Sequence, residues 1–333
     1  MSFDTFLSSG MAGGENDVLA KRPYIATNGR YAGQPVVTVN TGQLDEGGNP
    51  VYAERPINTN ATLQSAGLTY NVGGLGTIIS EWEQGSEITD AEITMDGETV
   101  NNKDRQAFGL NGVPIPIIQK DFTIGERMLL ASRQRGASLD VTTGTEAARA
   151  VARKSESMIF FGANIGASNS AGNSYSIPGL TTFADRETYT IADWSDTVNV
   201  TPEDIFKDIL AMVQALETNQ RSYGPFNLYI PGVYASRFRE DFKEFSDKTL
   251  MERVQDEDSI ARVRVSDVLT AGNVILQEMN RRVIDLAVAA DVTTVQWSSG
   301  SGFTNNFKTY AAWAPRLKSD YGGRCGTCHG STA

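Results

Sequence analysis

Apolar residues change their spacing several times along the chain, and each change predicts a different element. Residues 1–70 hold only short apolar pieces among many Gly, Asn and Thr, so we expect an extended arm that cannot bury itself. Such an arm either stays loose, as chain ends do, or becomes ordered on a neighbouring subunit. Between residues 75 and 118 the pattern changes to strands, because Ile88, Ala91, Ile93 and Met95 lie near period two and Asp96-Gly97 supplies a hairpin turn. This pattern predicts a long β-hairpin whose polar tip projects into water or onto a partner.

Two Thr-x-x-Glu capping boxes follow, and each marks the start of a helix. The first predicted helix begins at Thr123 and ends at Gly136, and the second begins at Thr143 and ends at Gly162. The second helix carries an alanine-rich face, which lets a sheet approach closely, so it suits a long spine packed across strands. A connection rich in Gly, Ser and Asn, residues 166–197, separates these helices from the rest of the chain.

Helices alternate with strands in the remaining chain. Thr201, followed by Pro202 and by an acidic residue at the third helical position, predicts a sharp helix start, and apolar residues then recur at helical spacing. With the strands that follow, this pattern predicts a compact α/β subdomain over about 200–290. We expect a further helix around 234–242, a charged stretch at 243–258, and strands at 225–231, 274–279, 283–289, 292–297, 307–314 and 316–321.

Composition narrows the class of protein. The chain has 333 residues, 40% of them hydrophobic, which is enough for a substantial core. Its formal net charge of −11 disfavours a protein whose main task is to bind phosphates, because such binding rests on clustered Lys and Arg. No cationic segment precedes an apolar run at the amino terminus, and no apolar stretch is long enough to span a bilayer. We therefore expect a soluble protein that is not secreted.

The sequence displays no catalytic apparatus. His329 is the only histidine, which removes most acid–base and triad arrangements, and no pair of carboxylates is marked out by an apolar setting. Cys325-Gly-Thr-Cys328-His329 matches the attachment pattern of c-type haem, in which the thiols bond the haem vinyls and the histidine ligates iron. The other interpretations are a thiol pair or an adventitious metal site, and a structurally neutral carboxyl tail, which we favour. We expect no enzyme, no cofactor and no metal.

A locally basic region lies within this acidic chain, at residues 127–154. Acidic residues are interspersed there, so most of the cations fit ordinary solvated helix faces. A sharper interpretation is salt bridging between subunits. Nucleic-acid binding ranks third, because no aromatic residues are interleaved as stacking platforms. The basic residues are Arg127, Arg133, Arg135, Arg149, Arg153 and Lys154.

Three blocks of residues resemble the family of encapsulins and tailed-phage major capsid proteins, and together they span about 110–321 in the family's order. The first block contains Pro114-Ile-Pro-Ile-Ile118, Phe122-Thr-Ile, Ile159-Phe-Phe-Gly162 and Ile177-Pro-Gly-Leu180. The second contains Thr201-Pro-Glu-Asp-Ile205, Gly224-Pro-Phe-Asn-Leu-Tyr229 and Tyr234. The third is Ala314-Pro-Arg-Leu-Lys-Ser319-Asp-Tyr321-Gly.

The resemblance implies an α+β chain with the Hong Kong 97-type phage capsid fold. By similarity, the chain would consist of an N-terminal arm at 1–74, an extended β-hairpin loop at 75–118, a peripheral domain at 119–200 and 291–333 with a spine helix at about 144–161, and an axial α/β domain at 201–290. No long helical segment at the front resembles a cleaved scaffolding domain. Assembly would therefore use a separate scaffold or none.

The function that the resemblance implies is structural. The chain would be the major capsid protein of a tailed phage, forming hexamers and pentamers that close into an icosahedral shell around DNA. The alternative is an encapsulin shell that encloses a cargo enzyme, and a distant alternative is a haem or thiol redox protein built on Cys325, Cys328 and His329. The family's partners are copies of itself, a scaffolding protein, a portal, a decoration protein and non-specifically packaged DNA, with no membrane. The protein would assemble in the cytoplasm of a host bacterium and end in the virion capsid.

Several residues are candidates for subunit contacts. Lys103 lies in the projecting loop, where some relatives place a crosslinking lysine, but its surroundings match no such motif, so no crosslinking residue is carried over. The candidate interface residues are Trp82, Lys103, Arg105, Arg127, Arg133 and Arg135.

Overall fold

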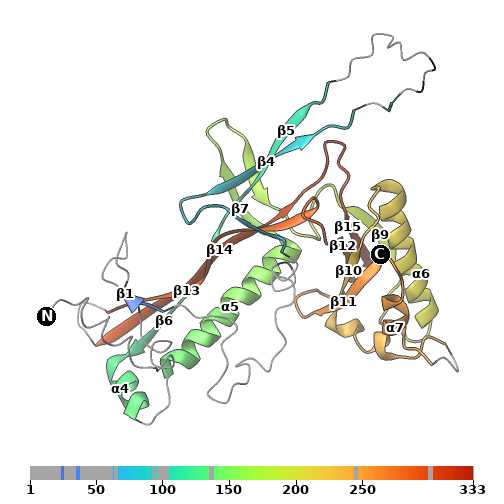
Figure 1. Cartoon of the computed structure of the whole chain (residues 1–333). Helices are drawn as coiled ribbons and strands as arrows, with labels where there is room; N and C mark the ends of the chain where they lie inside the picture. Colours follow the sequence, from blue (N-terminus) through green and yellow to red (C-terminus); the bar gives the residue numbers. More distant parts are fainter. Residues whose placement is uncertain are drawn as a thin grey trace. The chain divides into compact units, whose positions relative to one another are not determined.

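A computed structural model describes residues 24–25, 35–37, 63, 67–88, 90–91, 93, 95, 105–134, 139–243, 247–298 and 303–332 (Figure 1). These residues fall into two compact units. Unit 1 takes its described residues from Met1–Val51, Gln119–Val151 and Asp291–Ala311, and unit 2 takes them from Tyr52–Ile118, Ala152–Ala290 and Ala312–Ala333. Four elements contribute residues to both units, namely β6 (Ile117–Gly125), α5 (Leu139–Phe161), β13 (Ile284–Ser298) and β14 (Thr304–Leu317).

Unit 1 is built on a sheet with the strand order β1, β2, β13, β14, β6. Its other strands are β1 (Tyr24–Ile25), β2 (Pro35–Val37) and β6 (Ile117–Gly125), and helix α4 (Glu126–Gln134) follows β6 without a break. Phe122 on β6 stacks on Phe307 of β14, with ring centroids 4.8 Å apart and ring planes at 5°. Ile124 joins this aromatic pair in a small core.

The main core of unit 2 lies on a five-stranded sheet with the order β11, β10, β12, β15, β9. The strands are β9 (Glu187–Ile191), β10 (Phe226–Pro231), β11 (Ile260–Ser266), β12 (Asn273–Glu278) and β15 (Thr327–Thr332). β10 is parallel to β11 and β15 is parallel to β9, whereas β12 is antiparallel to both of its neighbours. The sheet is therefore mixed, and β15, the last of the described strands along the chain, lies inside it between β12 and β9.

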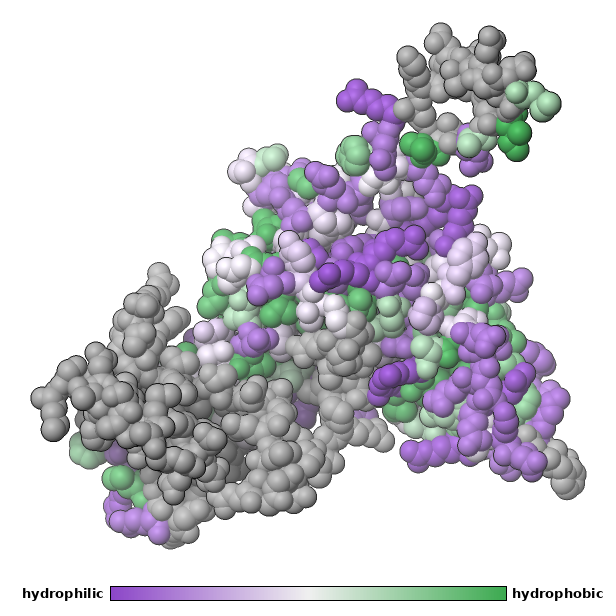
Figure 2. All heavy atoms as spheres, in the orientation of Figure 1, coloured by the Kyte–Doolittle hydropathy of each residue, from purple (hydrophilic) through white to green (hydrophobic). Residues whose placement is uncertain are grey.

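Helix α6 (Pro202–Asn219) covers β9 and β15, and helix α7 (Leu250–Gln255) contacts β11. The apolar spacing of α6 predicted one buried face, and Ile205, Ile209, Met212 and Leu216 are fully buried there. In the view of Figure 2, hydrophilic residues dominate the surface over α6 and α7, as expected for amphipathic helices packed on a sheet.

Two antiparallel ribbons and a short strand complete unit 2. β4 (Ile79–Gly85) pairs with β5 (Phe108–Pro114), and β7 (Ala163–Ser168) pairs with β8 (Ser174–Ile177) beside β5 (Figure 1). β3 (Thr69–Asn71) pairs parallel with β13. The first ribbon is the base of the predicted β-hairpin, whereas the predicted turn at Asp96-Gly97 lies outside the described residues.

The predicted start of α6 is confirmed in atomic detail. The Thr201 hydroxyl oxygen accepts a hydrogen bond from the backbone N–H of Asp204 at 3.3 Å, and the Asp204 carboxylate accepts one from the backbone N–H of Thr201 at 3.2 Å. Pro202 occupies the first turn. The cap fixes where this helix begins because two otherwise unpaired N–H groups are satisfied.

The other two predicted capping boxes are wrong. Thr123 lies inside β6, so α4 begins three residues later, at Glu126; pairing with β14 continues the strand up to the helix. Thr143 lies inside α5, which begins at Leu139, so the spine helix is longer than the predicted 144–161. A threonine within a helix costs only a few tenths of a kcal/mol, about 0.7 at most, so a capping pattern does not by itself stop a helix from extending upstream.

Several other element predictions are corrected by the structure. The helix expected around 234–242 is replaced by two 3-10 turns, η1 (Gly232–Tyr234) and η2 (Arg237–Arg239). The paired runs predicted near 283–297 and 307–321 are the single long strands β13 and β14, because pairing between strands overrides short polar interruptions. The charged stretch 243–258 contains α7, and the connection 166–197 contains the end of β7 together with β8 and β9.

The carboxyl end differs most from expectation. Residues 327–332 form β15, between β12 and β9, so the favoured interpretation of a neutral tail is wrong. The five-stranded sheet therefore draws strands from both sides of the predicted axial domain at 201–290. The division into arm, loop, peripheral and axial parts stays a prediction.

A close backbone approach explains the Ile177-Pro-Gly-Leu180 motif. Gly162 ends α5 with φ +73°, a left-handed conformation that suits glycine. A Cβ atom on Gly179 would lie 2.2 Å from the Gly162 nitrogen. The backbone N–H of Leu180 then donates to the Ile159 carbonyl at 2.9 Å, so this segment satisfies the free carbonyls at the helix end.

Candidate functional site

A buried ion cluster lies in unit 2 where β13 meets β14. Asp285 on β13 is fully buried, and its Oδ1 and Oδ2 accept hydrogen bonds from Nε and Nη2 of Arg316, both at 2.6 Å. Lys318 Nζ lies 2.6 Å from the same Oδ2. One buried carboxylate thus holds two cations in a bidentate and a single contact, the geometry in which buried ion pairs are strongest.

Arg316 also joins segments that lie far apart in the sequence. Its guanidinium carbon is 4.0 Å from the ring centroid of Tyr70 on β3 and 5.8 Å from that of Trp82 on β4. Its Nη1 donates to the Ser80 hydroxyl at 3.1 Å. The guanidinium therefore fixes the base of the β4–β5 ribbon to β3, β13 and β14. We call Arg316, Asp285 and Lys318 the ion cluster.

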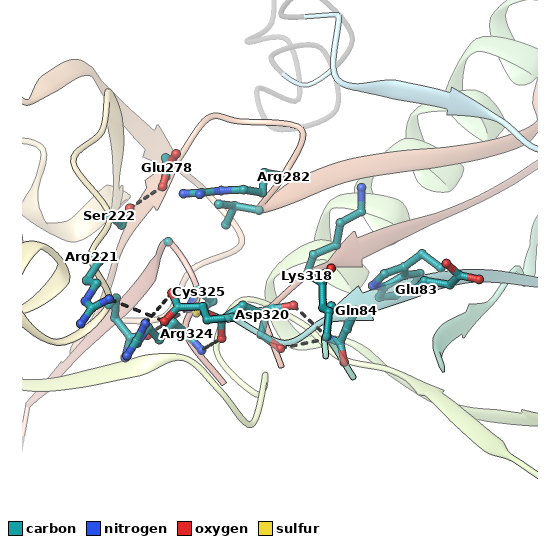
Figure 3. Close-up of a pocket in the computed structure, with 18 residues that line it drawn as sticks. Glu83, Gln84, Arg221, Ser222, Glu278, Arg282, Lys318, Asp320, Arg324 and Cys325 are labelled. Atoms are coloured by element: carbon teal, nitrogen blue, oxygen red, sulfur yellow. Dashed lines mark hydrogen bonds and ion pairs between the residues drawn. The ribbon is translucent and has the colours of Figure 1, made fainter. Parts of the chain in front are cut away.

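Next to the ion cluster is a pocket of about 470 Å³ (Figure 3). It lies between the base of the ribbon, residues 220–222, the turn from β12 to β13 and the connection from β14 to β15. Basic and acidic side chains alternate around it. The charged residues in its lining are Glu83, Glu87, Arg221, Glu278, Arg282, Lys318, Asp320 and Arg324.

Four of these eight charged residues, namely Glu87, Arg221, Lys318 and Arg324, form ion pairs within the chain. Glu87 lies 2.8 Å from Arg324 and 3.6 Å from Arg221, and Lys318 pairs with Asp285. The Gln84 amide donates to the Ser319 carbonyl at 3.0 Å. These contacts tie the ribbon to the β14–β15 connection on the opposite side of the pocket, so the base of the ribbon is held at several points.

The β4–β5 ribbon has two different faces. Residues directly opposite each other on an antiparallel pair share a face, and Trp82, which lies near Arg316, is on the inner one. Phe108 pairs with Gly85 and Leu110 pairs with Glu83, so both apolar side chains are on the outer face. Their exposed fractions are 66% and 49%. We call Phe108 and Leu110 the outer ribbon face.

The Cys-x-x-Cys-His motif is part of the five-stranded sheet. Cys328 is fully buried in the core under α6, and burial raises the pKa of its thiol to about 12. Cys325 is also buried, with a pKa raised to about 11, chiefly by burial. His329 is the next residue along β15, so it points to the opposite face, where its Nε2 lies 2.9 Å from Asn273 Oδ1.

This geometry does not fit a haem. A c-type haem would have to bond a thiol inside the apolar core and be ligated by a histidine on the other face of the same strand. Burial lowers the pKa of His329, with a further contribution from nearby Arg186, so its imidazole is held neutral in the sheet. Among the described residues, no group of three or more His, Cys, Asp and Glu side chains is placed to hold a metal ion.

The predicted interface residues lie in different parts of the chain, and some lie outside the described residues. Trp82 packs near Arg316 of its own chain, and its indole nitrogen has no hydrogen-bond partner. Arg105 is exposed just before β5, and Arg127 is exposed in the first turn of α4. Arg133 belongs to α4, whereas Lys103 and Arg135 lie outside the described residues. A role for these residues between subunits stays a prediction.

Sequence reasoning missed the ion cluster. Arg316 and Lys318 were part of the third resemblance block, but no role followed from the block alone. Asp285 lies in an apolar run between Ile284 and Leu286. An acidic residue within a buried strand indicates that a cation lies beside it, because an unpaired buried charge is costly. Sequence patterns could not identify the cation, because the partners are 31 and 33 residues away.

The fold belongs to a known class. The structure is similar to the capsid of Myoviridae phage XM1, with a TM-score of 0.63, 14% identity and coverage of 85% of this chain and 95% of that one. It is also similar to the virus-like particle from Pyrococcus furiosus, with a TM-score of 0.53, 19% identity and coverage of 81% and 98%. The chain therefore has the Hong Kong 97-type capsid fold.

A family model matches residues 66–330, and the chain belongs to that family, described as a family of unknown function (DUF6260). Two curated relatives are also similar in sequence. A diheme-cytochrome-encapsulin shell fusion protein of Kuenenia stuttgartiensis is 31% identical over 122 residues, which are 36% of this chain and 30% of that protein. The type 1 encapsulin shell protein EncA of Myxococcus xanthus is 26% identical over 207 residues, which are 61% of this chain and 65% of that protein. The chain thus spans less than two thirds of either relative.

No helix among the described residues has the length and apolar character needed to cross a membrane.

Proposed function

We propose that this chain is the structural subunit of a closed protein shell and, more specifically, the major capsid protein of a tailed phage. Hexamers and pentamers of the chain would form an icosahedral capsid around DNA, assembled in the cytoplasm of a host bacterium. The protein would have no catalytic role, since its function is the shape and strength of the shell. A scaffolding protein, a portal and a decoration protein are further proposed partners.

The outer ribbon face is the observation that carries the proposal. Phe108 and Leu110 lie side by side on one face of a regular β-ribbon, and both remain largely exposed. Adjacent exposed apolar side chains on a regular element mark contact surfaces. Near the same ribbon, Ile78 is 68% exposed and Ile88 is 65% exposed. Because the fold is that of shell-forming proteins, we assign this surface to contact with a second copy of the chain.

The test replaces both apolar residues of the outer ribbon face with acids. Wild-type chain should sediment as large particles that appear as closed shells in electron micrographs. Phe108→Glu with Leu110→Glu should keep the wild-type circular dichroism spectrum and remain as small oligomers, because carboxylates cannot be buried unpaired in the contact. The matched control, Phe108→Leu with Leu110→Met, keeps the apolar surface and should assemble.

Two results would refute the proposal. The first is a wild-type chain that stays monomeric over a wide range of concentration, salt and pH. The second is a doubly acidic variant that forms the same shells as wild type. Charge reversal at Arg127, which is exposed in α4, tests the proposed salt bridging separately and should slow assembly without unfolding the subunit.

An encapsulin shell is the second candidate function. The supporting observation is that the two curated relatives described above are encapsulin shell proteins. Particles isolated from cells that naturally carry the gene separate the two candidates. Nuclease-protected DNA of uniform length supports a phage capsid, whereas one co-purifying enzyme at a fixed ratio to the shell supports an encapsulin.

A further inference from the structure

One buried carboxylate in the pocket forms no ion pair with a cation among the described residues. Glu278 ends β12 in the lining of the pocket and is 3% exposed. Its Oε2 accepts a hydrogen bond from the Ser222 hydroxyl. None of the ion pairs formed among the described residues includes Glu278. A buried charge normally requires a partner of opposite charge. The Glu278 carboxylate lacks such a partner among the described residues.

Asp285 and Glu278 differ in their charged partners. Both carboxylates are buried in unit 2, and Asp285 receives two cations from its own chain. Glu278 instead lies beside Gly326, where a Cβ atom would come within 2.7 Å of its Oε2. The glycine therefore leaves room for the carboxylate at this place. The local backbone accommodates a charged group while no described residue neutralises it.

Three of the cations around the pocket already pair with acidic residues other than Glu278. Arg221 and Arg324 pair with Glu87, and Lys318 pairs with Asp285. Arg282 is exposed and forms no ion pair among the described residues; in Figure 3 its guanidinium end points toward Glu278 across the pocket. Glu278 and Arg282 both line the pocket, and no ion pair joins them among the described residues.

We propose that the pocket is a binding site for a guanidinium or primary ammonium group, which pairs with Glu278. Either group donates several N–H bonds, and a planar guanidinium matches a carboxylate in two contacts. The cavity of about 470 Å³ has room for such a head group and part of its stem. The cation comes either from a basic side chain of a second copy or from a free alkylamine. The site does not depend on the shell proposal, because it lies within one chain.

Binding is tested on the unassembled full-length chain with two probes of nearly the same shape. Methylguanidinium carries the positive charge, and methylurea is its neutral analogue. In calorimetric titration at pH 7, methylguanidinium should bind at one site per chain, and methylurea should show no saturable heat. Glu278→Gln should weaken methylguanidinium binding at least tenfold, since the amide keeps the shape and removes the charge.

Two further variants control for folding and for local charge. Glu83→Gln removes an exposed carboxylate at the margin of the pocket and should change the affinity less than twofold. Ser222→Ala keeps the Glu278 carboxylate but removes its hydroxyl donor, so it should bind the probe as tightly as wild type or more tightly. If Glu278→Gln folds poorly, wild type itself should still bind methylguanidinium and not methylurea, because only the charged probe pairs with a carboxylate.

The source of the cation follows from a comparison of assembly states. If assembled particles no longer bind methylguanidinium while free subunits do, a second copy supplies the cation. If both bind at one site per chain, the natural occupant is a free amine. The proposal is overturned if wild type does not bind, or if only Arg282→Ala binds, because Arg282 would then be the partner of Glu278 within its own chain.

Discussion

Replacing Arg316 with alanine should strongly destabilise the subunit. The substitution removes two 2.6 Å charged hydrogen bonds from Asp285, which is fully buried, and leaves it with Lys318 alone. Breaking a buried ion pair by removing one partner costs about 3–5 kcal/mol. Lys318 retains its contact, so the lower part of that range applies to the carboxylate. Loss of the guanidinium stacked on Tyr70 at 4.0 Å adds about 1–2 kcal/mol, so we expect a total of about 4 kcal/mol.

The assay is urea unfolding of the unassembled subunit, followed by circular dichroism. Arg316→Lys keeps a charge but loses the bidentate geometry and the flat stacking surface. It should therefore lower the free energy of unfolding by about half as much as Arg316→Ala does. Replacing both Arg316 and Asp285 with apolar residues, as Met and Leu, should recover part of the lost stability, because no carboxylate is then left buried without its partner. The reasoning is refuted if Arg316→Ala loses less than about 1 kcal/mol, a typical effect of an ordinary substitution.

Three further predictions address the cap, the thiols and the glycine contact. Hydrogen bonds from the Thr201 hydroxyl, from Lys207 and from the Thr201 backbone N–H lower the pKa of Asp204 from 3.8 to about 2. The stabilisation by the Asp204 carboxylate is therefore complete above about pH 4 and is lost as the pH falls toward 2. Asp204→Asn should flatten the acid side of the curve of stability against pH, and an unchanged curve would argue against the cap. Burial raises the thiol pKa of Cys325 to about 11 and of Cys328 to about 12. The stabilisation of the fold by the protonated thiols is therefore full below the thiol pKa of the unfolded chain, about 9, and falls as the pH rises above it. Ellman's reagent should accordingly label native protein at pH 8 hardly at all and unfolded protein at both thiols, whereas rapid native labelling would contradict their burial. Gly179→Ala places a Cβ 2.2 Å from the Gly162 nitrogen and should cost about 1–3 kcal/mol of unfolding free energy; a variant as stable as wild type would show that the contact relaxes freely.

Local signals predicted those elements in which neighbouring residues supply the stabilising contacts. The start of α6 is the best example, since its capping threonine, its proline and its acidic partner lie within four residues. The predicted caps at Thr123 and Thr143 have the same spacing but failed. There, strand pairing continued β6 and helical hydrogen bonds extended α5. A capping box therefore determines a boundary only where no stronger pairing crosses it.

The ion cluster and the pocket could not be predicted in this way. The ion cluster needs Ser80 and Asp285 near Arg316, which lies 236 and 31 residues from them. The pocket needs Glu278 beside Ser222, 56 residues earlier. Propensity and spacing carry no information on such pairs. Only the pairing of strands brings them together, and burial then sets how strongly they interact.

The sequence by itself determined that a β-hairpin lies between residues 75 and 118, that α6 is a capped amphipathic helix, and that the chain resembles shell-forming proteins. The residues with alternating spacing, 88–95, lie outside the strands β4 and β5. The tertiary structure alone decided that the carboxyl end is a central strand, that its cysteines are buried on one face with His329 on the other, and that the acid of β13 meets two cations. The physical reason is the range of the interactions. Caps, turns and apolar periodicity act within a few residues, whereas strand order and ion pairing depend on which distant segments share one core.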